Sequence, residues 1–188
     1  MRLILALLFL GLAAADIDTQ CQLCFTAQPF ASYCMLGLDS VRGKCCVPGS
    51  GDSCLLTQFF CTNTVTTSFA YSKYAYCSFD ASKCGGTSRN LFAINTPQTV
   101  STSLVFESYD VCPYYLMSRT DLPFNTNVKV TVNTAVNAYV YLLTGPSFDG
   151  LTSQTQLSSD QSKTFSSKEI GIIIVVASTT APFVSFSY

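Results

Sequence analysis

The stretch CGGTSRNLFAINTPQTVSTSLVFESYDVC, residues 84–112, separates two parts of the chain that differ in cysteine content. Nine of the ten cysteines lie at or before Cys84, and Cys112 is the only one beyond it. If Cys84 and Cys112 form a disulfide, the eight upstream cysteines are an even number and can pair among themselves. The sequence therefore predicts a cysteine-rich head, residues 16–83, and a tail, residues 84–188, with one disulfide at its start.

The first residues of the chain have the pattern of a secretory signal peptide. Arg2 supplies a positive charge, residues 3–12 form an apolar run, and residues 13–15 are three alanines that suit cleavage. We therefore expect a signal peptide over residues 1–15 and a mature protein that is secreted or held at the cell surface. A retained anchor is the weaker alternative, because a membrane-spanning helix needs about 20 apolar residues. The apolar run at residues 170–177 is shorter still, so no transmembrane segment is expected.

The composition excludes several classes of function. The chain contains no histidine, which removes Ser-His-Asp and Cys-His catalytic arrangements and histidine-ligated metal sites. Charged residues make up 11% of the chain, and removal of Arg2 leaves nine basic and eleven acidic residues, a net charge of −2. The chain has no basic stripe that would bind nucleic acid. We therefore expect a protein that is not an enzyme and that has no cofactor, no metal site and no nucleic-acid partner.

The cysteines of the head predict a disulfide framework formed in an oxidising compartment. They are Cys21, Cys24, Cys34, Cys45, Cys46, Cys54, Cys61 and Cys77. We expect them to pair among themselves, although adjacent Cys45 and Cys46 cannot readily bond to each other. Cys21 and Cys24 have the spacing of a redox pair, but no strand–helix pattern surrounds them, so structural disulfides are favoured. Each disulfide would stabilise the small head by roughly 2–4 kcal/mol.

The opening of the head resembles a PSI module, the cysteine-rich unit of plexins, semaphorins and integrins. The resemblance comes from Cys21-x-x-Cys24, the pair Tyr33-Cys34, the step Gly43-Lys44-Cys45 and the count of eight cysteines. The tryptophan that is typical after the third cysteine is missing, since the chain has no tryptophan. The resemblance implies a structural spacer that orients a neighbouring domain.

An aromatic stretch near the end of the head, SFAYSKYAY at residues 68–76, alternates well enough to predict a strand. We favour the interpretation that its rings supply the small apolar mass of the head. The alternative is an exposed aromatic row that stacks on sugar rings.

The tail changes to a period of two, which predicts strands. The alternating runs are Val128–Val132, Tyr139–Leu143, Ile170–Val176 and Val184–Tyr188, with shorter candidates at Leu104–Tyr109, Pro113–Met117 and Gln161–Phe165. Ile170–Val176 is apolar on both faces and is expected at the centre of a sheet. The valine run Val128–Val132 is expected to have one wet face, meaning a face exposed to solvent. Short strands separated by turn residues predict an all-β fold, an antiparallel sandwich of two sheets.

The tail resembles a CUB domain, a jelly-roll β-sandwich, over about 105 residues. The matching pieces occur in order at residues 84–87 (CGGT), 112–116 (CPYYL), 127–132 (NVKVTV), 138–141 (AYVY, followed by Gly145) and 183–188 (FVSFSY). The resemblance implies a disulfide between Cys84 and Cys112, which is the pairing that we predict. It also implies recognition of an extracellular protein or glycan through loops at one end of the sandwich.

Two departures from the CUB pattern affect the expected chemistry. No cysteine follows Cys112, so the second disulfide of the family is absent. Ala138 stands where calcium-binding members have an aspartate, with Asn133 and Asn137 nearby. Because calcium needs six to eight oxygen ligands with carboxylates among them, we do not transfer the calcium site. The remaining carboxylates, Glu107, Asp110 and Asp149, are a weak fallback, and solvated loop charges are the favoured interpretation.

The sequence supports two main hypotheses for function. The first is a secreted, non-enzymatic binding or adhesion protein that recognises a protein or glycan. The second is a structural subunit of an extracellular coat, filament or appendage, in which an edge strand such as Phe183–Tyr188 pairs with a neighbouring chain. A disulfide-rich inhibitor, or an enzyme with unusual catalytic residues, is a third and weaker alternative.

Overall fold

The computed structural model describes residues 21–27, 32–35, 43–46, 69, 71–94, 96–118 and 127–188. The expected signal peptide, residues 1–15, lies outside these residues, and so do Cys54 and Cys61. Among the described residues, no helix is both long enough and apolar enough to cross a membrane.

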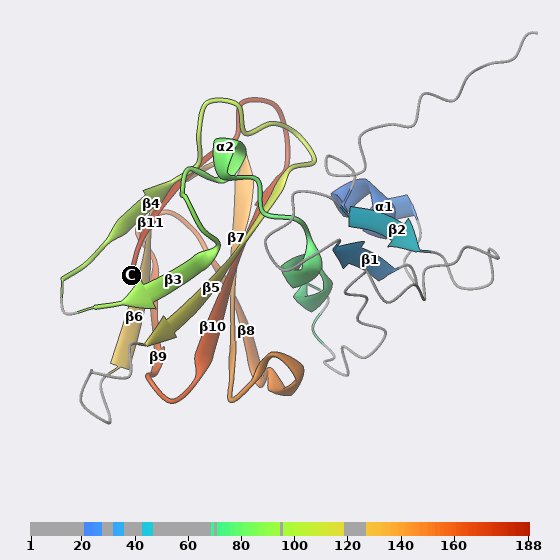
Figure 1. Cartoon of the computed structure of the whole chain (residues 1–188). Helices are drawn as coiled ribbons and strands as arrows, with labels where there is room; N and C mark the ends of the chain where they lie inside the picture. Colours follow the sequence, from blue (N-terminus) through green and yellow to red (C-terminus); the bar gives the residue numbers. More distant parts are fainter. Residues whose placement is uncertain are drawn as a thin grey trace, which may run out of the picture.

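The described part of the chain is built mainly of strands (Figure 1). The strands are β1 (Ser32–Met35), β2 (Gly43–Cys46), β3 (Asn90–Ala93), β4 (Thr99–Ser101), β5 (Val111–Ser118), β6 (Asn127–Val136), β7 (Ala138–Gly145), β8 (Ser153–Leu157), β9 (Ser162–Ser166), β10 (Ile170–Ala177) and β11 (Phe183–Ser187). The helices are α1 (Cys21–Ala27) and α2 (Ala81–Cys84), and two 3-10 turns are η2 (Ser72–Tyr76) and η3 (Phe148–Gly150).

The tail forms two sheets that face each other, so the predicted all-β sandwich is confirmed. One sheet has five strands in the order β3-β5-β10-β7-β8, and the other has four in the order β4-β11-β6-β9. All neighbours are antiparallel except β3, which runs parallel to β5. β10 lies at the centre of the larger sheet, as its apolar residues on both faces predict. Its branched side chains favour this extended, fully paired position.

The inner core fills the space between the two sheets. Along β6, Val128, Val130 and Val132 point into it while Lys129 is exposed, so the predicted wet face of the valine strand is confirmed. From β10, Ile173 and Val175 enter the same core. Burial of apolar side chains on this scale is the main favourable contribution to folding.

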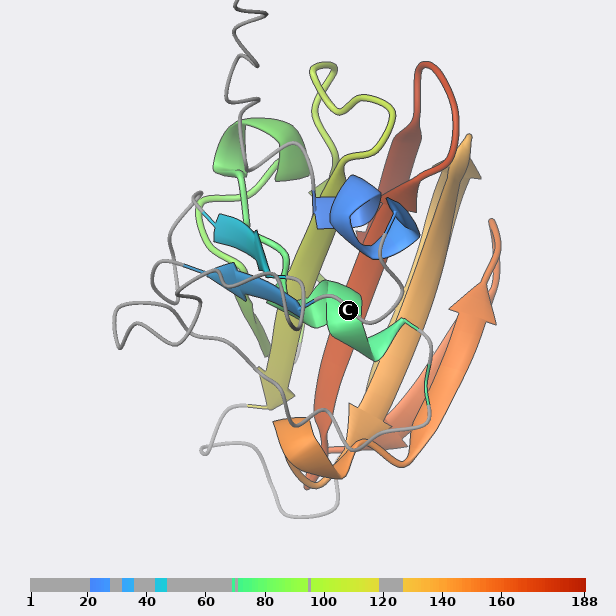
Figure 2. The same ribbon diagram turned by 90° about the vertical axis from the view of Figure 1, so that its right-hand side faces the viewer.

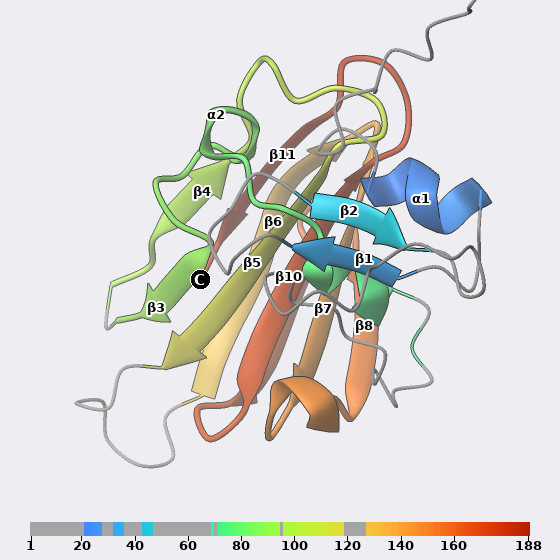
Figure 3. The same cartoon turned by 45° about the vertical axis from the view of Figure 1, so that its right-hand side comes forward.

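A second, outer core covers the other face of the five-stranded sheet. Its sheet residues are Val111, Tyr141, Leu143, Ile172, Ile174 and Val176. The residues that cover them come from the head and include Cys21, Cys24, Tyr33, Tyr74, Ala75 and Cys77. Figures 2 and 3 show α1, β1 and β2 lying against this face of the sheet. The head therefore supplies the layer that the outward-facing apolar residues of β7 and β10 require.

Three disulfides lie within the described residues. Intramolecular disulfides in this number indicate a non-reducing compartment. Cys84 and Cys112 are bonded, with an S–S distance of 2.02 Å, and this is the pair that the sequence predicts. In the head, Cys21 bonds to Cys77 and Cys24 bonds to Cys45. Cys21 and Cys24 are thus not a redox pair with each other. The side chains of the other four head cysteines, Cys34, Cys46, Cys54 and Cys61, are outside the part of the chain that the structure describes, so their pairing stays a prediction.

The predicted strand at residues 68–76 is wrong for the residues that the structure describes. Ser72–Tyr76 forms the 3-10 turn η2, in which the amides of Ser72, Tyr74 and Cys77 donate to carbonyls three residues earlier. The Ser72 hydroxyl also donates to the Phe69 carbonyl at 2.7 Å. Local hydrogen bonds therefore replace a sheet ladder, and the three-residue period brings both Tyr71 and Tyr74 toward the outer core.

Two further predictions about strands are wrong. Leu104–Tyr109 is a loop with two turns. A strand would place Leu104 and Phe106 on the same face, but Phe106 is buried and Leu104 is 98% exposed. β11 is not an edge strand, since it lies between β4 and β6 and uses both of its edges. The edge pairing that the assembly hypothesis assigns to Phe183–Tyr188 is therefore blocked by neighbours within the same chain. Of the shorter candidates, Pro113–Met117 is confirmed as part of β5, and Gln161–Phe165 is confirmed except for Gln161, since β9 begins at Ser162.

Candidate functional site

Three connections between strands meet at one end of the sandwich, which we call the loop end. They are residues 102–110 between β4 and β5, Asn137 between β6 and β7, and residues 178–182 between β10 and β11. The Ala177 amide donates to the Asp110 carbonyl at 3.0 Å, and the Ser178 amide donates to the Asn137 carbonyl at 2.9 Å. These bonds hold the three connections side by side, as seen at the top of Figure 1.

The loop end collects most of the exposed large apolar side chains of the described residues. Leu104 is 98% exposed, Val105 and Tyr109 are each 52% exposed, and Val136 and Tyr139 are each 47% exposed. The other two exposed residues of this kind, Leu23 on α1 and Phe92 on β3, lie elsewhere. Single exposed apolar residues are normal on a protein surface, so a group of them at one end makes the loop end the candidate site.

The base of loop 102–110 is attached to the fold by several bonds. The Cys84–Cys112 disulfide joins the end of α2 to β5, just beyond the loop. Next to it, Lys83 Nζ lies 2.8 Å from Asp110 Oδ1, and only 7% of the Asp110 side chain is exposed. The Ser103 amide donates to the Lys83 carbonyl at 2.8 Å. Because both ends of the loop are bonded to α2, the loop has little freedom to change its orientation.

Gly85 explains how α2 can lie so close to the loop. It ends α2 with a φ of 68°, in the left-handed region. A Cβ built there would lie 1.6 Å from the carbonyl oxygen of Ser101. Only glycine suits both the conformation and the contact.

The interior of loop 102–110 determines which side chains point outward. Phe106 is only 2% exposed and belongs to the inner core, so it anchors the loop from below. The Phe106 amide donates to the Ser103 carbonyl at 3.2 Å, which closes a tight turn. Leu104 and Val105 are the central residues of that turn and therefore point into solvent. Tyr109 has a φ of 72°, a left-handed conformation that costs a non-glycine residue about 1–2 kcal/mol.

The loop end is close to electrically neutral. Lys83 and Asp110 form an ion pair, and the Glu107 amide donates to the other Asp110 carboxylate oxygen at 2.8 Å. Residues 133–139 and 177–188 contain no charged side chain. The exposed Glu107 carboxylate is therefore the main charge near the apolar residues, so long-range attraction of a charged partner is small.

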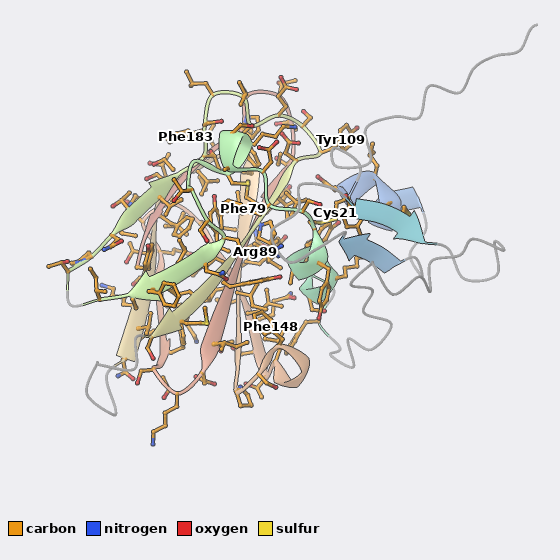
Figure 4. The ribbon with its side chains drawn as sticks, viewed as in Figure 1. Cys21, Phe79, Arg89, Tyr109, Phe148 and Phe183 are labelled. Atoms are coloured by element: carbon orange, nitrogen blue, oxygen red, sulfur yellow. A yellow bond between two sulfur atoms is a disulfide. The ribbon has the colours of Figure 1, made fainter. Side chains whose placement is uncertain are left out.

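The three residues of the weaker calcium alternative do not lie in one part of the fold. Glu107 and Asp110 lie in the loop end, but Asp149 belongs to η3, which follows the far end of β7. Figure 4 shows the separation, with Tyr109 at the loop end and Phe148 at the opposite end. Within the described residues, no group of three or more His, Cys, Asp or Glu side chains is placed to hold a metal ion. Ala138 lies at the start of β7 and offers no side-chain ligand.

The aromatic residues near η2 are packed against the sheet. The rings of Tyr71 and Tyr141 stack with centroids 3.7 Å apart, and the Tyr71 amide donates to Gln154 Oε1 at 3.3 Å. Burial raises the pKa of Tyr141, and a hydrogen bond to Tyr71 raises it further. Burial likewise raises the pKa of Tyr74, whose exposed fraction is 9%. This packing agrees with the interpretation that the stretch supplies apolar mass, and it leaves Tyr74 no free face for a sugar.

The sequence did not identify the loop end residue by residue. The apolar run Leu104-Val105-Phe106 resembles a strand when only alternation is considered. The signal that could have revealed the loop is its polar surroundings, Ser101-Thr102-Ser103 before it and Glu107-Ser108 after it.

Comparison with known proteins does not assign the chain to a family. No protein-family model matches it, and no curated protein is significantly similar to it. The function must therefore be argued from the site itself.

Proposed function

We propose that this protein is a secreted, non-enzymatic binding protein that docks a partner protein through the loop end. The observation on which the proposal rests is Leu104, which is 98% exposed at the tip of a loop whose base is tied by a disulfide, an ion pair and backbone hydrogen bonds. A loop whose backbone is held in one conformation loses little further freedom on binding. Such preorganisation reduces the free-energy cost of association.

The chemistry of the loop end favours a protein partner over a glycan. The side chains of Leu104, Val105 and Val136 are aliphatic and have no hydrogen-bonding groups, whereas sugar recognition requires flat aromatic faces with polar groups beside them. Tyr109 and Tyr139 add amphipathic rings of the kind that is enriched at protein interfaces. Because the loop end is nearly neutral, we expect the partner to offer an uncharged apolar pocket and the affinity to change little with salt.

The domain assignments belong to the same proposal. The tail is a CUB-like domain and the head is a PSI-like spacer. The two-sheet sandwich and the Cys84–Cys112 disulfide support the first assignment. The packing of the head against one face of the sandwich supports the second. Secretion is supported by the disulfides and by the signal-like N-terminus.

The proposal is tested by probing arrayed extracellular proteins and glycans with tetramers of the mature protein. The test variant is Leu104→Asp, which removes an apolar contact worth about 1.5–3 kcal/mol when buried, and the affinity should fall at least about tenfold. The matched control is Phe92→Asp, because Phe92 is 49% exposed but lies on β3.

Binding to a protein that is lost in Leu104→Asp and retained in Phe92→Asp is the expected result. Equal binding by both variants, or binding confined to glycans, contradicts the proposal. A large loss of affinity between low and physiological salt also contradicts it, since a neutral contact is weakly screened.

Assembly into a coat or filament is the weaker candidate. Its structural basis was an unpaired β11, and β11 lies inside its sheet. Light scattering of the concentrated mature protein separates the two functions, because discrete polymers would favour assembly.

A further inference from the structure

The connection between β10 and β11 presents three consecutive hydroxyl side chains. Ser178, Thr179 and Thr180 are all exposed, and so is Ala181, whereas the following Pro182 is buried. The segment belongs to the loop end, and Figure 4 shows Phe183, the residue just after it, at the same end as Tyr109. It is the longest run of consecutive exposed Ser and Thr residues at that end of the molecule.

The three hydroxyls take no part in holding the fold together. Within the described residues, none of them makes a hydrogen bond with another protein group. Nearby hydroxyls behave differently: Ser101 Oγ bonds to Ser185 Oγ at 3.0 Å, and Thr102 Oγ1 accepts from the Val184 amide at 3.0 Å. Modification of the free hydroxyls would therefore break no internal bond, whereas modification of the others would.

The backbone of the segment is held in an irregular, accessible conformation. The Ser178 amide donates to the Asn137 carbonyl at 2.9 Å, and Asn137 Nδ2 donates to the Thr180 carbonyl at 2.8 Å. Ala181 has a φ of 53°, and Pro182 follows it. Neither Thr179 nor Thr180 belongs to a sheet ladder, so an enzyme can approach both side chains without opening a strand.

We infer that Thr179 and Thr180 are acceptors for O-linked sugars. Runs of Ser and Thr with a neighbouring proline are typical of O-glycosylated segments in proteins that pass through the secretory pathway, and the inference depends on that passage. The chain has no N-x-Ser/Thr sequon, and only 11% of its residues are charged. Sugars on this turn would hydrate the end of the molecule that exposes its apolar side chains.

The reaction is a glycosyl transfer from a nucleotide sugar. The threonine Oγ1 attacks the anomeric carbon, and a new C–O bond forms while the bond from that carbon to the phosphate breaks. The nucleoside diphosphate leaves with the bonding electrons, and the hydroxyl proton passes to a base of the transferase.

A competing acceptor, Thr96, precedes Pro97, and both residues are exposed. The adjacent Gln98 is part of a backbone pair with the C-terminal residue, in which each amide donates to the other's carbonyl at 3.0 Å. This pairing ties the residues just after Thr96 to the residue that follows β11, whereas Thr179 and Thr180 lie in an irregular connection between two strands. Thr96 is therefore a natural internal comparison.

The test is to express the full chain, with its own N-terminus, in cultured animal secretory cells and to measure the intact mass of the secreted protein. The expected mass exceeds that of the polypeptide by whole monosaccharides. The double variant Thr179→Ala/Thr180→Ala should lose this excess, and the control Thr164→Ala, at an exposed position on β9, should keep it.

Fragmentation that retains sugars on their side chains locates them in the wild-type protein even where the double variant is not secreted. A mass equal to that of the polypeptide overturns the inference, and so do sugars on Thr96 with none on Thr179 or Thr180. Since the readout is mass and not binding, the inference can fail while the loop end still binds its partner, and the reverse also holds.

Discussion

At the scale of single residues, Arg89 and Tyr115 connect the head to the sandwich. The Arg89 side chain is only 1% exposed, and its Nη1 donates to the Tyr115 hydroxyl at 2.9 Å. The same hydroxyl donates to the carbonyl of Ala75, in the head, at 2.7 Å. One phenolic oxygen thus both accepts from a buried cation and donates across the junction. Neither residue stands out in the sequence, because the bonds join positions far apart in the chain.

Removal of that hydroxyl should destabilise the protein. Tyr115→Phe keeps the ring but removes the hydroxyl, and with it one hydrogen bond to the Ala75 carbonyl and one from the Arg89 guanidinium. We expect the free energy of unfolding to fall by about 1–3 kcal/mol, measured by chemical denaturation. Tyr139→Phe is the control, because Tyr139 is 47% exposed and should change stability little. An equal effect of the two variants would contradict the role given to Tyr115.

The buried tyrosines make the fold sensitive to alkali. Burial raises the pKa of Tyr114. Burial is also the larger cause of the raised pKa of Tyr141, and a hydrogen bond to Tyr71 is the next. The folded state therefore keeps protons that the unfolded chain loses above about pH 10. Stability is fully present below that pH and decreases as the pH rises above it.

Tyrosinate absorbance measures this prediction. In the folded protein, some of the ten tyrosines should ionise at a higher pH than they do in denaturant. The protein should unfold as these tyrosines ionise. Superimposable titration curves with and without denaturant would refute it.

At the scale of elements, loop 102–110 shows how a short segment can be both exposed and ordered. Phe106 anchors it in the inner core, and its base is held by Cys84–Cys112 and by Lys83–Asp110. The ion pair is partly buried, with 21% of the Lys83 side chain and 7% of the Asp110 side chain exposed. Such a pair adds little net stability compared with an apolar replacement, but removal of one partner leaves a buried charge without compensation.

Lys83→Met tests the contribution of the ion pair. It leaves the Asp110 carboxylate with its bond from the Glu107 amide but without its cation. We expect a loss of about 1–3 kcal/mol in the free energy of unfolding and faster hydrogen exchange in residues 102–110.

The control for this prediction is Lys168→Met, since Lys168 is exposed on the turn between β9 and β10. The double variant Lys83→Met/Asp110→Asn should recover part of the loss, because the uncompensated charge is gone. Unchanged exchange in the loop would show that the ion pair does not hold it.

At the scale of the whole molecule, the five-stranded sheet is covered on both faces. The four-stranded sheet covers one face and the head covers the other. Ile173 and Ile174 are adjacent in β10, and each has an exposed fraction of 0%, although they face different cores. The head is therefore a structural layer of the sandwich, and its apolar residues contribute to the stability of the tail.

Removal of the Cys21–Cys77 disulfide should loosen this layer. The bond spans 56 residues, and Cys21→Ala/Cys77→Ala should lower the free energy of unfolding by about 2–4 kcal/mol. Exposed apolar surface, measured with a hydrophobic dye, should rise in the variant.

The control is Leu23→Ala, on the same helix α1, because Leu23 is 37% exposed. If the variant without the disulfide kept the stability and dye binding of this control, the head would not be needed to cover the sheet.

Much of the architecture follows from alternation alone. The doubly apolar run at residues 170–176 determines a central strand, and a central strand with two apolar faces requires a cover on each side. The resemblance of the tail to a CUB domain implies the Cys84–Cys112 pair, which leaves an even number of cysteines upstream. The inference about the strand succeeds because a local pattern of apolar residues reports how many faces of a segment are buried.

Tertiary structure decided the rest, because a local pattern does not report which neighbour buries a residue. β11 reads like any half-buried strand, and only its position between β4 and β6 makes it internal. Leu104 and Phe106 are both apolar and two residues apart, yet one is 98% exposed and the other 2%. The sequence by itself determined an all-β chain with a cysteine-rich part. The loop end, and the side chains that it presents, depend on contacts between segments that are distant in the chain.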